Sequence, residues 1–214
     1  MTREESVFLA RKLLAQQVWR AARLEGCNVT FPDTQSILDG AVPAGLTTDD
    51  VAVVLNLREA WRYLLSALDE PFGLELVREI NARVAHGLSL APGQWRDGAI
   101  GISGTDWRPA PPTTRTIEEV FALAGPATER AITFATRAMR AQLFWDGNKR
   151  TALLAANHLL LSSGAGMLSI PEQAIPAFNR ELTAFYNTGD AAPLTAWLYS
   201  SALTGLDRPR ERER

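Results

Sequence analysis

The chain has 214 residues, of which 46% are hydrophobic and 21% are charged. This length allows a sizeable buried core, and the composition excludes a chain that is disordered throughout. The net charge of −2 argues against a protein that binds nucleic acid through bulk electrostatics, and we expect no nucleic-acid partner. No apolar run approaches the roughly 20 residues of a membrane span, and the N-terminus lacks a signal-peptide pattern. We therefore expect a cytoplasmic protein with no membrane partner.

Apolar residues at helical spacing predict three helices in the first part of the chain. The first covers residues 6–24 and ends near Gly26, which suits a helix C-terminus. The second covers residues 47–68 and opens with Thr-Thr-Asp-Asp, a typical helix start. The third covers residues 74–86 and ends at Gly87.

Residues 91–112 break this pattern, because they are rich in glycine, proline and tryptophan. Within them, Ile100 and Ile102 alternate with glycines, which is typical of a short β-hairpin or an extended flap. An exposed edge of this kind can pair with another chain. A plain surface loop explains the same residues equally well.

Helices are predicted again in the second half of the chain. Residues 126–141 carry one apolar stripe, and Gln142 continues it, so its amide should point inward or into a cleft. Residues 150–163 are apolar nearly all round, which is typical of the buried centre of a bundle. Two further helices are expected over residues 171–186 and 192–203. The predicted fold class is all-α, a helical bundle with one small β-hairpin flap.

The segment between the striped helix and the buried helix reads Phe-Trp-Asp-Gly-Asn-Lys-Arg-Thr over residues 144–151. At a helix N-terminus the unpaired backbone N–H groups and the positive end of the helix dipole favour an anion. Gly147 allows a ligand to approach the backbone closely, and Asn148 can donate an amide hydrogen bond. Lys149 and Arg150 add two positive charges, and arginine can grip phosphate with two hydrogen bonds.

Asp146 is an acid among these cations, and it could hold Mg²⁺, which usually takes one or two carboxylates together with phosphates. Together the groups fit a nucleotide polyphosphate. The alternative is an Asp-Gly-Asn turn that caps a helix and carries solvated charges, and the residues alone favour the phosphate site only slightly.

The sequence FWDGNKRTALLAANHLLL resembles the signature of the Fic (Fido-domain) proteins, His-x-Phe-x-(Asp/Glu)-Gly-Asn-(Gly/Lys)-Arg. The match comprises Phe144 and residues 146–150. Leu24-Glu25-Gly26 is similar to the N-terminal segment of Fic proteins that carry an inhibitory helix, and residues 92–96 and 107–112 are similar to the flap before the motif.

The resemblance covers roughly residues 15–205 and implies a Fic-type bundle that forms one domain over residues 1–206. Within that domain we distinguish an inhibitory-helix-like segment (1–45), the flap (91–112) and a motif loop (142–151). The charged tail, residues 207–214, is predicted to be disordered.

Most Fic enzymes transfer AMP from ATP to a hydroxyl group of a target protein. Carried over to this chain, the resemblance implies that Asp146 binds Mg²⁺, that Asn148 and the backbone of Gly147 and Lys149 hold the phosphates, and that Arg150 grips the polyphosphate. It also implies that a protein target docks on the flap as an added strand, along Ile100, Gly101, Ile102 and Ser103.

Two departures from the family pattern bear on activity. Gln142 stands where the family has a histidine that acts as general base, and losing a general base costs roughly 10²–10⁴-fold in rate. Leu153 replaces an arginine that normally pairs with the inhibitory glutamate, and Ala21 replaces its usual Ser or Thr. Glu25 could still reach Arg150 or Lys149.

Neither histidine of the chain is an obvious replacement base. His158 lies two turns into the apolar helix, where a hydrogen-bonded core histidine is expected, and His86 ends a helix before the flap.

Three functions follow in order. The first is a nucleotide-binding protein with weak or altered AMP transfer, which takes ATP or another nucleotide together with Mg²⁺. The second is a non-catalytic pseudoenzyme that serves as a binding module. The third is a phosphotransferase similar to Fic-fold toxins, which the GNKRTAL variant without a second arginine resembles. A homodimer is left open.

Overall fold

The computed structural model describes residues 1–205, and within that range it contains ten α-helices, one short 3₁₀ helix and one pair of two-residue strands. The all-α fold class is therefore confirmed, while the predicted disordered tail, residues 207–214, lies outside the described residues. The helices of the first half are α1 (Arg3–Lys12), α2 (Leu14–Leu24), α3 (Phe31–Leu38), α4 (Thr48–Ser66) and α5 (Leu74–Val84). The later elements are α6 (Thr114–Phe121), α7 (Ala127–Ala141), α8 (Asn148–Ser162), β1 (Met167–Leu168), η1 (Glu172–Ala174), α9 (Ile175–Thr188), α10 (Ala192–Ser201) and β2 (Leu203–Thr204).

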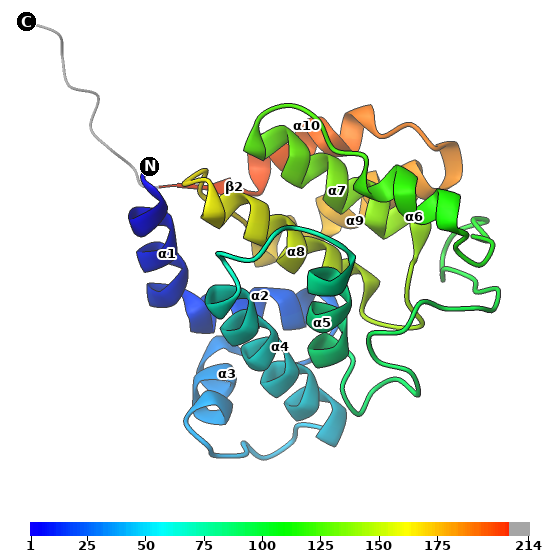
Figure 1. The fold of residues 1–214 in the computed structure, drawn as a ribbon. Coiled ribbons are helices and arrows are strands. Elements are labelled where there is room, and N and C mark those ends of the chain that lie inside the picture. The colour runs from blue at the N-terminus through cyan, green and yellow to red at the C-terminus, as the bar shows by residue number, and fades with distance from the viewer. Residues whose placement is uncertain (206–214) are drawn as a thin grey trace, which may run out of the picture.

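Helix α8 forms the centre of the molecule, with α1–α5 on one side and α6, α7, α9 and α10 on the other (Figure 1). It packs against α7, α5, α4 and α1, and nearly all of its residues are buried. The prediction of a buried central helix is confirmed, because a helix that is apolar all round is stable only where other helices cover every face.

The first predicted helix, residues 6–24, is two helices in the structure. The break lies at Leu13, whose backbone leaves the helical region at φ −98° and ψ 12°. The break lets α1 pack on α8 while α2 packs on α3 and α4. Two short helices with different partners share one apolar spacing, so the pattern alone did not show the boundary. Helix α3 was not predicted.

The start of α8 differs from that of the helices around it. Helices α1, α3 and α4 begin with capping boxes in which Thr2, Thr30 and Thr47 bond a backbone N–H group of the first turn. Helix α8 has Gly147 at its N-cap, in the left-handed region at φ 73°, and no side chain caps it. Its first-turn N–H groups therefore need a different partner.

The flap, residues 91–112, runs as an extended loop, and the predicted hairpin does not form in it. Its strand-like contact is a single antiparallel bridge between Trp95 and Phe144. The buried guanidinium of Arg96 explains the shape, because it donates hydrogen bonds to the carbonyl oxygens of Gly98 and Ala110 and, at the end of α7, to that of Gln142. Both ends of the flap are thus fastened to α7 rather than to each other.

The one strand pair of residues 1–205 lies elsewhere, where β1 pairs antiparallel with β2 and Met167 faces Thr204. Each strand has two residues, too few to leave a period-two pattern in the sequence. Among the described residues no helix is long and apolar enough to span a membrane.

Candidate functional site

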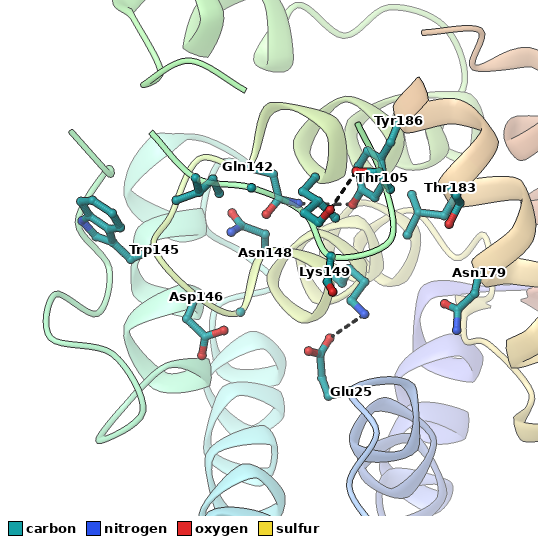
Figure 2. A pocket seen from close by; sticks show the side chains of 16 residues that line it. Glu25, Thr105, Gln142, Trp145, Asp146, Asn148, Lys149, Asn179, Thr183 and Tyr186 are labelled. Atoms are coloured by element: carbon teal, nitrogen blue, oxygen red, sulfur yellow. Dashed lines mark hydrogen bonds and ion pairs between the residues drawn. The ribbon is translucent and has the colours of Figure 1, made fainter. Parts of the chain in front are cut away.

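A cavity of about 530 Å³ opens at the N-terminus of α8. Its floor is the motif loop and the first turn of α8, and the flap and one face of α9 close its sides (Figure 2). The motif contributes Gln142, Trp145, Asp146, Gly147, Asn148 and Lys149 to the lining. The other walls are formed by Glu25, Ile100, Gly101, Ile102, Ser103, Thr105, Asn179, Leu182, Thr183 and Tyr186. The structure thus brings together every predicted site residue except Arg150.

Gly147 is needed at the N-cap for two physical reasons. Its φ of 73° is one that side-chain-bearing residues rarely adopt, and a Cβ atom there would lie 2.7 Å from Cγ1 of Val84 on α5. The close approach of α5 and the lack of a capping side chain leave the first-turn N–H groups of α8 directed at the cavity. This end of the helix carries partial positive charge and suits an anion.

The amide of Asn148 holds the motif loop in shape. Its Oδ1 accepts a hydrogen bond from the Phe144 N–H group at 2.9 Å, and its Nδ2 donates to the Phe144 carbonyl oxygen at 2.8 Å. Asn148 was predicted to hold phosphate, but in the structure one amide hydrogen and the amide oxygen are already used within the loop. Its observed role is to position the backbone that faces the cavity.

Two acids and two bases alternate at the base of the cavity. Lys149 Nζ lies 3.6 Å from Oε1 of Glu25, an ion pair that joins α8 to the end of α2 (Figure 2). Arg150 lies 3.2 Å from Asp146 and 3.7 Å from Glu25. The Arg150 side chain is 4% exposed, compared with 41% for Asp146. Lys149 therefore reaches the cavity itself, while Arg150 is buried beside the two acids.

Gln142 ends α7 in the left-handed conformation, with φ 48°. Its Nε2 donates hydrogen bonds to the Met139 carbonyl oxygen at 2.6 Å and to the Tyr186 hydroxyl at 3.3 Å. Burial raises the pKa of Tyr186 well above its ordinary value, so this hydroxyl stays protonated at neutral pH. The amide points inward at the edge of the cavity, as the sequence predicted, and it offers no proton acceptor of useful basicity.

The histidines lie away from this cavity. His158 is buried, its Nε2 lies 2.9 Å from the Ala67 carbonyl oxygen, and burial lowers its pKa. His86 is exposed at the end of α5 and does not line the cavity. The prediction that His158 is a hydrogen-bonded core residue is confirmed.

Asp146 and Glu25 are the carboxylates that line the cavity. Within residues 1–205, no group of three or more His, Cys, Asp or Glu side chains could hold a metal ion. One exposed carboxylate fits Mg²⁺ only in the manner usual for nucleotide sites, in which phosphate oxygens and water supply the remaining ligands.

Sequence reasoning missed Asn81, which connects three parts of the site. Its Nδ2 donates to the Asp146 carbonyl oxygen at 2.9 Å and to the Thr151 hydroxyl at 3.0 Å, and its Oδ1 accepts from the Gly93 N–H group at 2.9 Å. A polar residue directly after Ile80 on the buried face of α5 was the signal available. Asn179, Thr183 and Tyr186 were also missed, although their helical spacing places them on one face of α9.

The motif loop, the uncapped start of α8 and the flap all fall within one contiguous stretch of sequence. Residues 71–160 match the sequence model of the Fic/DOC family. The match runs from α5 through the flap to most of α8, which is fewer than half of the 214 residues. No curated protein sequence matches the chain.

Solved Fic structures resemble the whole bundle. Residues 134–508 of Fic-1 from C. elegans superpose with a TM-score of 0.72 at 20% identity, over 88% of this chain and 59% of that one. A Fic family protein from Desulfovibrio desulfuricans G20 gives 0.69 at 15% identity, over 92% and 62%. A Fic-domain signaling protein from Bacteroides thetaiotaomicron VPI-5482 gives 0.69 at 18%, over 89% and 82%.

These similarities establish that the chain has the Fic fold. The chain spans less than two thirds of the C. elegans and Desulfovibrio structures.

Proposed function

We propose that the protein binds ATP or another nucleotide in the cavity at the start of α8, with the polyphosphate against the uncapped first turn. The observation that carries this proposal is the meeting of that helix N-terminus with Lys149 in a cavity of about 530 Å³. Such a volume is typical of small-molecule sites. The positive end of the helix and the ammonium group both favour phosphate over a neutral ligand.

The proposed roles follow from where the side chains lie. The first-turn backbone of Gly147 and Lys149 binds phosphate oxygens, and Lys149 adds a charged hydrogen bond. Asn148 keeps the loop open toward the ligand through its bonds to Phe144. Asp146 would hold Mg²⁺ that arrives with the nucleotide, and the ion would neutralise phosphate charge. Arg150 supports this carboxylate from the buried side at 3.2 Å.

We further propose that the nucleotide serves AMP transfer to a protein hydroxyl at a weak or altered rate. The Fic fold and the motif support the reaction class. Residues 100–103 line the cavity and have no strand partner within residues 1–205, which leaves their backbone available to a target segment. The amide of Gln142 cannot remove the proton of that target hydroxyl, so the transfer lacks a general base.

The hydrogen bonds of Gln142 also favour a second candidate, a nucleotide-binding module without chemistry. Its Nε2 is bonded to Met139 and Tyr186, which are parts of the protein itself. In this candidate the cavity keeps its ligand and the flap presents a surface to a protein partner.

Calorimetry with ATP, with and without Mg²⁺, tests the nucleotide site. We expect the wild type to bind and Lys149→Ala to bind about tenfold or more weakly, as for the loss of a charged hydrogen bond. Lys12→Ala is the matched control, because Lys12 is exposed near the end of α1 and is the other lysine of the chain. A wild type that binds no nucleotide would remove the proposal.

Labelled ATP then separates the chemistries. Transfer of an α-label indicates AMP transfer, and transfer of a γ-label alone indicates the phosphotransferase that the GNKRTAL variant resembles. Binding without transfer of either label identifies the non-catalytic module.

A further inference from the structure

A second, smaller cavity adjoins Arg150 in the interior of the bundle. Its volume is about 30 Å³, and α2, α4, α8 and residues 168–170 enclose it. Its polar lining comes from Gln17 and Arg20 on α2, Arg150 and Asn157 on α8, and Ser169. It is separate from the cavity at the motif loop, with which it shares no lining residue.

Three side chains of this lining carry buried nitrogen atoms without an acceptor. Nε2 of Gln17, Nε of Arg20, and Nε and Nη1 of Arg150 have no hydrogen-bond partner within residues 1–205. Gln17 is 3% exposed and Arg150 is 4% exposed. Native proteins rarely leave buried donors unsatisfied, because each such group loses its hydration without replacement. The cavity therefore calls for an occupant that accepts hydrogen bonds.

The charges around the cavity favour an anion over water. Two guanidinium groups line it, and no carboxylate does. Arg150 shares Glu25 and Asp146 with Lys149, which balances two positive charges against two negative ones. The hydrogen bond found for Arg20 goes to the neutral Ser169 hydroxyl at 3.4 Å, and no ion pair involves it within residues 1–205. One positive charge is thus left uncompensated beside the cavity.

The size of the cavity limits the anion. A volume of about 30 Å³ admits one or two water-sized species and excludes sulfate, phosphate and carboxylate ligands. Asn157 needs no further partner, since its amide already bonds the backbone of Leu153 and Leu168. We propose that this cavity is a binding site for a chloride-sized monovalent anion, held by Gln17, Arg20 and Arg150 between α2 and α8.

The test is thermal unfolding of the protein without nucleotide, so it does not depend on the proposed function. Sodium chloride and sodium bromide are compared with sodium gluconate at one fixed ionic strength, which removes general screening from the comparison. We expect the halides to raise Tm by about 2–4 °C, the shift for a ligand present at several times its Kd. An equal Tm in chloride and gluconate would show that water fills the cavity, and it would overturn the proposal.

Two variants locate the effect. Gln17→Glu places a carboxylate in the cavity, so its Tm should no longer respond to halide, while Gln16→Glu adds the same charge at a partly exposed neighbour and should keep the response. If Gln17→Glu fails to fold, Arg20→Met should lose the response instead. A halide response that persists in whichever of these two variants folds would place the anion elsewhere and contradict the site.

Discussion

At the scale of single residues, the position of Gln142 decides what chemistry the cavity can support. Its Nε2 donates two hydrogen bonds into the protein, to Met139 and to Tyr186. A neutral imidazole has one donor and one acceptor nitrogen, so a histidine here could keep a single inward bond and offer its other nitrogen to a substrate hydroxyl. The surrounding loop needs no change for this, because Asn148 and Asn81 hold it independently.

We therefore expect Gln142→His to create or raise AMP transfer by about 10²-fold or more, the contribution of a general base. The gained activity should fall below about pH 6.5, where histidine takes up its proton. The measurement is transfer from α-labelled ATP to the protein itself and to a cell lysate, with Gln142→Asn as a control that keeps an amide. A histidine variant that binds ATP and gains no transfer would contradict the view that only the proton acceptor is missing.

At the scale of elements, the site depends on how closely α5 approaches the start of α8. Asn81 and Val84 on α5 contact the motif loop, one through hydrogen bonds and the other through the space it leaves for Gly147. The sequence predicted the anion-binding helix start from local residue types. It could not predict the role of α5, because this contact joins residues about 65 positions apart in the chain.

Gly147→Ala should destabilise the fold by more than a glycine substitution at similar φ elsewhere. The new Cβ would meet Val84 Cγ1 at 2.7 Å, and Val84 is β-branched and turns away with difficulty. Gly26→Ala is the control, because its φ of 86° carries similar strain and nothing lies within 4 Å of its Cβ position. We expect Gly147→Ala to cost about 1–3 kcal/mol more in urea unfolding, the range for overpacking. Equal costs would show that α5 yields to the loop.

At the scale of the whole molecule, the two sides of the bundle meet at the cavity. Glu25 ends α2, Lys149 begins α8, and Tyr186 lies on α9, so residues from the start, middle and end of the chain share one ligand space (Figure 2). Helical spacing predicted most of the helices because each buries one stripe. The course of the flap was not predictable, since it follows from the buried guanidinium of Arg96, whose carbonyl partners lie on two segments.

The ion pair between Glu25 and Lys149 makes occupancy of the cavity depend on α2. At 3.6 Å, with side chains 20% and 29% exposed, it holds the ammonium group that the proposed phosphate would use, and the carboxylate repels that phosphate. Glu25→Gln removes both effects and should tighten nucleotide binding about two- to fivefold, in keeping with the modest energy of a partly exposed ion pair. Glu172→Gln is the matched control, because Glu172 pairs with Arg23 on the same helix at 3.0 Å and lies outside the cavity lining. Titrations of ATP into the three proteins measure the effect. If the Glu25→Gln curve coincides with those of the wild type and the control, α2 does not restrain the ligand and Glu25 is a helix-terminal surface residue.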